Sequence, residues 1–437
     1  MLTTIQNALK TKEIRMKLLY VLIGLVIVRI GCNIPIPGTK PDVMQNLFSS
    51  NQSLGFLDVM TGGSFSRMSI FALNITPYIT ASIILQLLTI AIPRLEEMQK
   101  DGEDGRKKIN EYTRYLSIAL AVIEGAAIVI GFRNQGLFGT DNPQSSMTTA
   151  IVVAVAALTA GAAFMMWLGE QITEKGVGNG ISIVLVINIV SRMPSDIAGL
   201  VTNYVTGASS IGGKFLAIII IIAVVVGIIA YVVWLQDGVR HIGVQMSQKV
   251  QGRRQVGGQQ STIPLKVNTA GVIPIIFASS ILQFPVVIAS FFGKTPEWTN
   301  YLSQSHWCNP AHMKYSIGFV AYIVMIIFFA YFYTSITFNP REVAKNLNDR
   351  GGFITGIRSG KPTVEYLTNI LNYIILIGAI GLIIAACIPI VASGVAGANV
   401  SFGGTSIIII VGVILETITT VKSMMIERKY QNVKGIF

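Results

Sequence analysis

Residues able to perform acid–base or metal chemistry are scarce in this chain of 437 residues and lie far apart. The cysteines lack the spacing of a metal site, and the histidines all fall outside the long apolar segments. These residues are Cys32, Cys308 and Cys387, and His241, His306 and His312. The sequence also lacks a phosphate-binding loop, a zinc-protease motif and a hydrolase nucleophile turn. We therefore expect no catalytic residue, metal or cofactor, and we expect that the chain is not an enzyme.

A glycine cluster at residues 176–180 superficially resembles a nucleotide-binding loop. It lies between two apolar segments and no strand precedes it, so it lacks the structural context of a dinucleotide site. A polar turn on the cytoplasmic side is the better interpretation. Any nucleotide energy must then come from a partner.

Charged residues inside the apolar segments are also few, with Arg29, Glu124 and Glu416 as the clear cases. An ion or proton pathway usually places several acidic or histidine side chains through the bilayer. A coupled ion pump is therefore disfavoured, although a secondary transporter with a substrate site at the membrane midplane remains the alternative function. We expect Arg29 to extend toward the outer membrane surface.

The charged and polar residues named above lie in or between long apolar segments. The composition is 52% hydrophobic and 12% charged, whereas an ordinary soluble domain has about 25% charged residues. With about 20 residues per crossing, the sequence predicts ten membrane spans. They lie near residues 18–34, 70–92, 115–132, 148–168, 178–193, 215–235, 269–290, 315–336, 364–388 and 404–421.

The predicted fold is an all-α polytopic membrane protein of two five-span halves, residues 1–193 and 194–437. An odd number of spans per half makes the second half enter from the opposite side, which is the arrangement of an inverted repeat. The fifth span is the weakest, because its apolar core covers only residues 181–190 before Arg192.

Basic residues gather in five bunches, each separated from the next by an even number of spans. The bunches cover residues 10–17, 94–114, 240–266, 341–361 and 422–434. Because cytoplasmic loops concentrate Lys and Arg, we expect both termini to be cytoplasmic. The net charge of +12 is explained by this topology, and aromatic residues are not interleaved with the cations as nucleic-acid binding would require.

Residues 55–67 fit neither a loop nor a span. The segment is moderately apolar, far too short to cross, and interrupted by Gly62 and Gly63. Two interpretations stay open. It is either a re-entrant piece buried in protein or an amphipathic helix on the membrane surface.

Polar side chains mark the second and seventh spans, which contain Pro77 and Pro274. We expect both helices to be kinked at these prolines. Such polar faces favour either a helix that must at times leave its neighbour or permanent interhelical contacts.

Motifs along the whole chain resemble the SecY family of protein-conducting channel subunits. The most specific are residues 167–182 and 69–86. Further matches are residues 34–38, 251–254, 265–268, 270–274, 338–342, 356–358 and 402–406. The chain departs from the family pattern at Asn74, where glycine is usual, and at Ser359, where proline is usual.

The resemblance implies a clamshell around an hourglass pore that opens sideways between the second and seventh spans. It identifies an apolar pore ring of Ile75, Ile79, Leu185, Ile276 and Ile409. It places Thr80, Gln86, Asn268 and Phe284 at the lateral gate, with Gln86 and Asn268 hydrogen-bonded to each other when the gate is closed. Residues 55–67 become the plug of the pore, including Phe56, Leu57, Val59, Met60, Gly62 and Gly63.

The resemblance also implies partners and a location. Two long cytoplasmic loops, at about 236–268 and 337–363, carry Arg253, Arg254, Arg341 and Arg358, which match residues that dock the SecA motor or the ribosome. SecE and SecG are the expected small subunits, and signal sequences and nascent polypeptides are the expected cargo. The lipid bilayer would be the bacterial plasma (inner) membrane.

Overall fold

The computed structural model describes most of the chain. The described residues are 10–50, 58, 61–133, 136–138, 144–202, 211–246, 249–251, 254–256, 260–291, 297–303, 307–308, 310–396 and 404–434.

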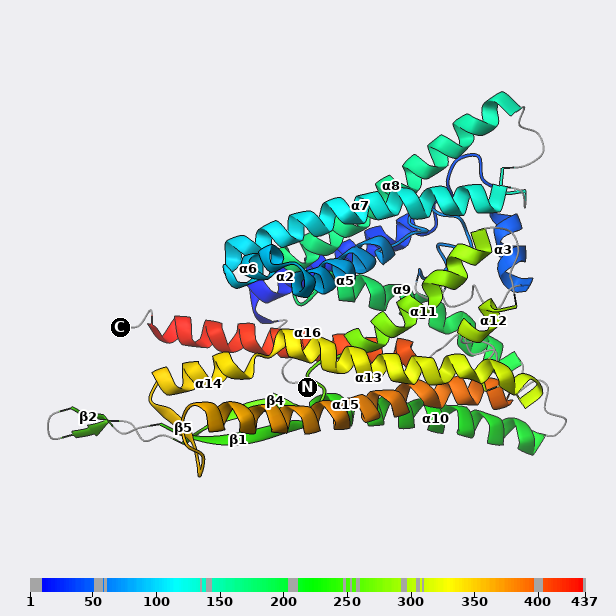
Figure 1. Cartoon of the computed structure of the whole chain (residues 1–437). Coiled ribbons are helices and arrows are strands. Elements are labelled where there is room, and N and C mark those ends of the chain that lie inside the picture. The colour runs from blue at the N-terminus through cyan, green and yellow to red at the C-terminus, as the bar shows by residue number, and fades with distance from the viewer. Residues whose placement is uncertain are drawn as a thin grey trace.

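Ten helices lie at the ten predicted spans and run side by side along one axis (Figure 1). Seven of the described helices are long and apolar enough to cross a membrane, and α5 with the bent α6 makes an eighth. The ten are α2 (Lys12–Gly31), α5 (Thr76–Ala91), α7 (Glu103–Arg133), α8 (Gln144–Lys175), α9 (Gly180–Leu200), α10 (Ile211–Asp237), α11 (Ile273–Phe291), α13 (Ile317–Thr337), α15 (Lys361–Ala396) and α16 (Gly404–Lys434).

The helices pack as two groups that follow chain order. In the first group α8 contacts α2, α7 and α9, and in the second group α15 contacts α10, α13 and α16. The groups meet along two seams, one between α9 and α16 and the other between α7 and α11. Helix α5 also contributes Ile83 to the buried cluster that contains Ile275 and Leu282 of α11. The predicted membrane fold of two helical halves is therefore confirmed.

The predicted proline kinks in the second and seventh spans are wrong. Helix α5 begins at Thr76 instead of near residue 70, so Pro77 lies in its first turn, and Pro274 is likewise the second residue of α11. Proline suits the first turn of a helix because its missing N–H would have no partner there. The bend occurs at the other end of α5, where α6 (Pro93–Lys100) turns away by 103°.

Helix α9 is longer than the predicted fifth span. It continues past Arg192 and Pro194 to Leu200, so the boundary expected between residues 193 and 194 falls inside a helix. The helix can continue because Arg192 has an ion-pair partner within the protein and does not face lipid alone.

The two long loops contain strands, which the all-α prediction missed. Strands β1 (Val239–Met246), β4 (Gln260–Lys266) and β5 (Gly352–Ile354) form an antiparallel sheet in the order β4-β1-β5. Strand β1 buries Ile242 and Val244 on one face, where they pack with Leu371 and Ile375 of α15. A separate hairpin joins β2 (Lys249–Gln251) to β3 (Arg254–Val256).

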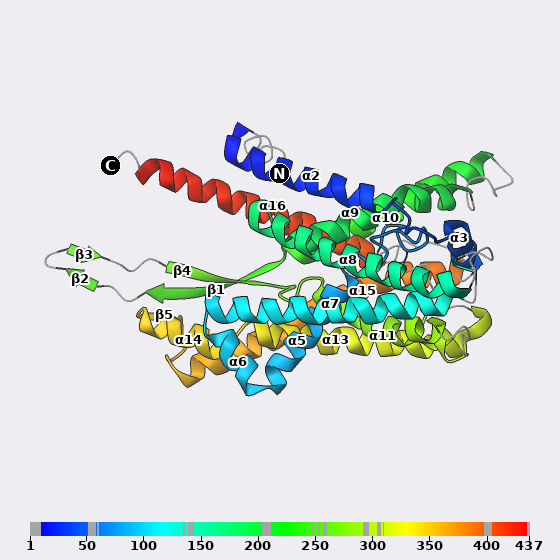
Figure 2. The same ribbon diagram turned by 90° about the horizontal axis from the view of Figure 1, so that it is seen from above.

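The sheet defines one end of the molecule. Helix α14 (Pro340–Asp349), α6 and the C-terminal part of α16 lie at the same end as the strands, and α2 starts toward that end (Figure 2). The short helices α3 (Pro41–Ser50) and α12 (Thr299–Leu302) lie at the opposite end (Figure 1), as does the 3₁₀ helix at Pro310–Ser316. All predicted basic bunches therefore lie toward one end.

Candidate functional site

The stretch of residues 61–75 runs into the helix bundle without forming a helix. Phe65, Met68 and Leu73 pack with Ile128 of α7 and Leu158 of α8 in one buried cluster. Two backbone hydrogen bonds, from Ile36 to Met68 and from Ile70 to Ile34, attach it to the segment after α2. The amphipathic surface helix is therefore the wrong alternative for residues 61–66, which are buried in protein.

Hydrogen bonds within this stretch satisfy its polar groups. The Asp58 carbonyl oxygen accepts from the Gly63 N–H at 2.8 Å, and Asp58 Oδ1 accepts from the Ser66 N–H at 2.9 Å. Ser64 Oγ donates to the Thr61 carbonyl at 2.7 Å and also contacts the Phe71 carbonyl at 3.1 Å. Such internal pairing is what allows irregular backbone to exist at membrane depth. We call residues 58 and 61–66 the plug base.

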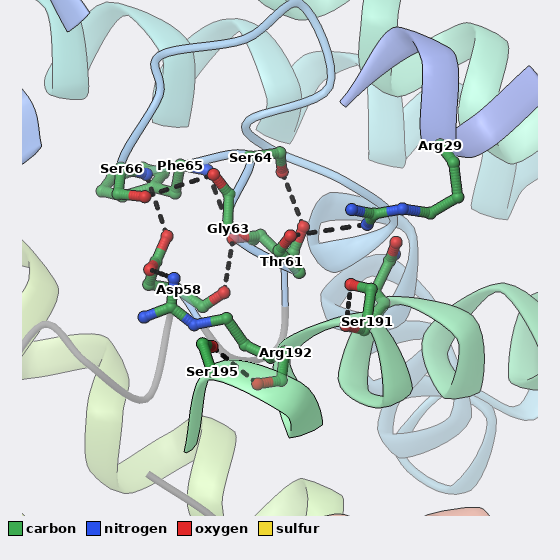
Figure 3. Close-up of polar contacts among 12 residues, drawn as sticks. Arg29, Asp58, Thr61, Gly63, Ser64, Phe65, Ser66, Ser191, Arg192 and Ser195 are labelled. Atoms are coloured by element: carbon green, nitrogen blue, oxygen red, sulfur yellow. Dashed lines mark hydrogen bonds and ion pairs between the residues drawn. The ribbon is translucent and has the colours of Figure 1, made fainter. Parts of the chain in front are cut away.

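Two arginines from different helices hold the plug base (Figure 3). Arg192 Nη1 of α9 lies 2.7 Å from Asp58 Oδ2, and the Asp58 side chain is only 2% exposed. Arg29 Nη1 of α2 donates to the Gly62 carbonyl at 3.4 Å. Arg29 therefore contacts the protein, and the expectation that it extends toward the outer membrane surface stays a prediction.

Sequence reasoning missed the roles of Arg192 and Asp58. In the sequence, Arg192 marks the end of the apolar core of the fifth span, and Asp58 is one polar residue in a short apolar segment. The sequence carries one signal for these roles. A cation beside an apolar segment needs a partner, and so does an acid within a buried segment. The pairing itself joins helix α9 to the plug base and is visible only in three dimensions.

The glycines of the plug base allow a close approach to α9. Gly62 and Gly63 have φ of 66° and 81°, in the left-handed region that favours glycine. A Cβ on Gly62 would lie 2.9 Å from the backbone oxygen of Asn188 on α9. The other predicted plug residues, Phe56, Leu57, Val59 and Met60, lie outside the described residues.

Backbone conformation also accounts for Asn74. Its φ is 52°, a value that glycine adopts readily and that asparagine tolerates better than most residues. Asparagine can therefore stand where the family usually has glycine. The position directly precedes Ile75 and the start of α5.

The five predicted ring residues come from four segments. Ile75 is buried with Val184 of α9, and Ile79 packs on the same cluster. Ile409 of α16 is buried with Ile189 of α9, and Ile276 of α11 packs on that second cluster. Ile183 of α9 contacts both clusters. Leu185, also on α9, is buried with 7% exposure.

The four gate residues lie on or beside α5 and α11. Thr80 Oγ1 donates to the Thr76 carbonyl at 3.1 Å, and Phe284 is 52% exposed. The expected hydrogen bond between Gln86 and Asn268 is not formed. Gln86 instead donates to Ser82 Oγ at 3.3 Å. Asn268 is buried, and its Nδ2 has no hydrogen-bond partner among the residues that the structure describes. The two amides belong to different helical groups, so their separation depends on how the groups meet.

The three described docking arginines, Arg254, Arg341 and Arg358, lie at the sheet end of the molecule. Arg358 is exposed in the short connection between β5 and α15, where its carbonyl accepts from Thr363 Oγ1 at 2.9 Å. Arg341 is exposed in the first turn of α14, capped by the Asn339 side chain. Arg254 begins strand β3, and Arg253 lies outside the described residues.

Metal-ligating side chains do not gather within the described ranges. No three Cys, His, Asp or Glu side chains there lie close enough to share an ion. The site is thus built from apolar clusters, an irregular buried segment and one buried ion pair.

The fold and this site define a class, that of multi-pass membrane channels with an interrupted segment between the first two spans. Comparison with known proteins identifies the family. The SecY family model matches residues 69–418, so the chain belongs to the SecY family. It is 43% identical to the protein translocase subunit SecY of Streptomyces scabiei over 445 residues, covering 99% of each chain.

Two solved structures share the fold. A structure described as a protein-conducting channel matches with a TM-score of 0.65 and 18% identity, covering 94% of this chain and 93% of that one. Sec61 in the canine ribosome-channel complex from the endoplasmic reticulum matches with a TM-score of 0.63 and 17% identity, with the same coverage.

Proposed function

We propose that this chain is a passive channel, closed at rest by the plug segment of residues 55–67, through which unfolded polypeptides cross the bacterial plasma membrane. Membership in the SecY family makes protein translocation its function. Transmembrane segments leave the same channel sideways into lipid. The relatives and solved structures reported above do not support the alternative of a secondary transporter with a midplane substrate site.

The main support for a closed resting state is the set of contacts that holds the plug base in place. A carboxylate buried to 98% needs a cation, and Arg192 supplies it from the helix that also carries Leu185. Arg29 holds the neighbouring carbonyl from a second helix. Opening therefore requires an ion pair to break or to move as a unit.

The pore ring seals the channel by exclusion of water. Branched aliphatic side chains at a narrow point disfavour hydrated ions, yet they can move aside for a polypeptide. Ile75, Ile79, Leu185, Ile276 and Ile409 would form this ring. The assignment of this ring is supported by helix α9, because its Ile183 contacts the clusters of both helical groups.

The lateral gate is the seam where α11 meets the first helical group. Thr80, Gln86, Asn268 and Phe284 flank it, and α7 and Ile83 of α5 pack across it. A signal sequence that contacts the parted helices better than the closed ones would shift the population toward the open form. The unpartnered amide of Asn268 would gain a hydrogen bond in that rearrangement.

The energy for translocation would come from other proteins, because the sequence contains no nucleotide-binding motif. SecA or the ribosome would bind the cytoplasmic end through Arg253, Arg254, Arg341 and Arg358, and the similar fold of a ribosome-bound channel supports this. SecE and SecG subunits would brace the two halves. The basic bunches at the sheet end support a cytoplasmic location of both termini.

Deletion of residues 57–65 tests the proposal directly. We expect the variant, purified with its partners and placed in planar bilayers, to conduct ions at rest, whereas the intact chain stays closed. Thermal unfolding of the same preparations checks that the variant is folded. A folded variant with unchanged conductance would contradict the role of the plug segment.

A further inference from the structure

Two of the cysteines lie toward the end of the molecule opposite the sheet. Cys308 stands between α12 and the 3₁₀ helix at Pro310–Ser316, and Cys387 lies in the C-terminal part of α15, which runs from the sheet to that opposite end (Figure 1). Both are free, half-buried thiols. The channel function proposed above uses neither of them.

The two thiols share one set of buried neighbours. Trp307 is fully buried, and its ring centroid lies 5.5 Å from that of Tyr322 on α13. Cys308 packs against the buried cluster that contains both aromatic residues and Ala386, the residue before Cys387. Tyr322 interacts electrostatically with Cys387, and so does Cys308. The connection after α12 therefore meets α13 and α15 at the two thiols.

The backbone around Cys308 is held in place. Its N–H donates to Ser316 Oγ at 3.2 Å, and Trp307 Nε1 donates to the Tyr301 carbonyl at 2.8 Å. Cys308 has a φ of 57°, in the left-handed region that costs free energy for a residue with a side chain. A residue keeps such a conformation only where its surroundings impose it. The thiol of Cys308 is thus fixed near α15.

We propose that Cys308 and Cys387 are a redox-sensitive pair that forms a disulfide bond on the outer side of the membrane. This location rests on the orientation proposed above, in which the sheet end is cytoplasmic. The opposite end then faces the exterior of the plasma membrane, an oxidising environment in which disulfides form and persist. Cys32 is not a partner, because it belongs to a separate buried cluster with Phe71 and Ile75.

Formation of the bond is a two-electron oxidation. The thiolate of one cysteine attacks a sulfur of an external disulfide oxidant, and the second cysteine then displaces the oxidant from the mixed disulfide. Both S–H bonds break, one S–S bond forms, and the two electrons and two protons leave with the oxidant as two thiols. Burial raises the pKa of the Cys308 thiol. This thiol is therefore a poor leaving group, and the bond resists reduction once it has formed.

The bond would join two parts of the second helical group. The connection that carries Cys308 follows α11, the helix of Ile276 and Phe284, whereas α15 follows the loop that contains β5. A cross-link that closes a long loop restricts the unfolded chain and so stabilises the folded one. The connection after α12 would then stay attached to α15 while α11 moves at the lateral gate.

A thiol map of the full chain with its co-purifying partners tests the pair. The complex is treated with oxidised glutathione or with dithiothreitol, then denatured, alkylated with iodoacetamide and digested, and the peptides are identified by mass spectrometry. The variants are Cys308→Ser and Cys387→Ser. The matched control is Cys32→Ser, which removes the cysteine of the other buried cluster.

We expect oxidation to remove two of the 3 alkylatable thiols of the intact chain and to yield one peptide pair that joins Cys308 to Cys387. The control should keep this pair, whereas both variants should lack it. Membranes from acid-quenched cells should contain the same pair without added oxidant. The oxidised complex should unfold at a higher temperature than the reduced one, and neither variant should show this difference.

A full set of alkylatable thiols after oxidation, glutathione bound to either cysteine without the pair, or a bond between two copies of the chain would overturn the proposal. So would a pair that forms with glutathione but is missing from the quenched cells. The thiol map of the intact chain decides the outcome even where a variant fails to fold. None of these measurements uses ion conductance, so their outcome is independent of the test of the plug segment.

Discussion

At the scale of single residues, the ion pair between Asp58 and Arg192 is the most informative contact of the molecule. The pair lies 2.7 Å apart, with Asp58 almost fully buried. Taking either partner away leaves the other charge without compensation, which typically costs about 3–5 kcal/mol at a buried pair. The carboxylate also accepts the Ser66 N–H, so its loss disturbs both the anchor on α9 and the fold of the plug base.

Charge reversal tests the anchor. We expect Asp58→Lys to raise the resting ion conductance of the channel, because two cations then face each other at the plug base. The double variant Asp58→Arg/Arg192→Asp should return conductance toward the intact level. Asp42→Asn, an exposed acid at the same end of the bundle, serves as the control. If the double variant conducts as much as Asp58→Lys, the two side chains act independently.

At the scale of elements, the non-helical stretch of residues 61–75 depends on close packing against α8. A Cβ on Gly161 of α8 would collide with the carbonyl oxygen of Ile70. That carbonyl belongs to backbone held by the hydrogen bond from Ile70 to Ile34. The approach of the stretch to α8 is therefore possible only with glycine at this position.

Two glycine substitutions separate packing from helix propensity. Gly161→Ala should lower stability by about 1–3 kcal/mol through overpacking. Gly227→Ala on α10, where no atom lies within 4 Å of the added Cβ, should be neutral or stabilise by up to about 1 kcal/mol. The measurement is thermal unfolding of the detergent-solubilised protein followed by tryptophan fluorescence. Equal effects of the two substitutions would mean that the contact with Ile70 is not tight.

At the scale of the whole molecule, charge and apolar surface are segregated. The basic bunches, the sheet and α14 lie at one end (Figure 1), and α10 exposes Phe215, Ile219 and Ile222 along its length. One end is thus strongly cationic, and the sides are suited to lipid. Arg358 stands out at the basic end because it is exposed between the sheet and α15, flanked by Gly356 and Gly360.

Arg358→Glu tests docking at this end. We expect it to abolish SecA-driven secretion in reconstituted vesicles while insertion and assembly of the chain persist, because an exposed side chain contributes little to folding. Arg106→Glu, an exposed arginine of the first basic loop, should secrete nearly normally. Normal secretion by Arg358→Glu would refute the assignment.

The membrane-spanning character, the ten spans and the gathering of the basic loops toward one end can be predicted from the amino-acid sequence. These properties are sums over neighbouring residues, since about 20 apolar residues make a span wherever they occur. The glycine-broken segment at residues 55–67 was recognised for the same local reason. Tertiary structure alone decided that Arg192 meets Asp58, that α11 packs on α7 and that strands β1 and β4 pair across a loop. Each of those contacts joins residues distant in the chain, and local composition carries no information about which partner a buried charge or an unpaired strand will find.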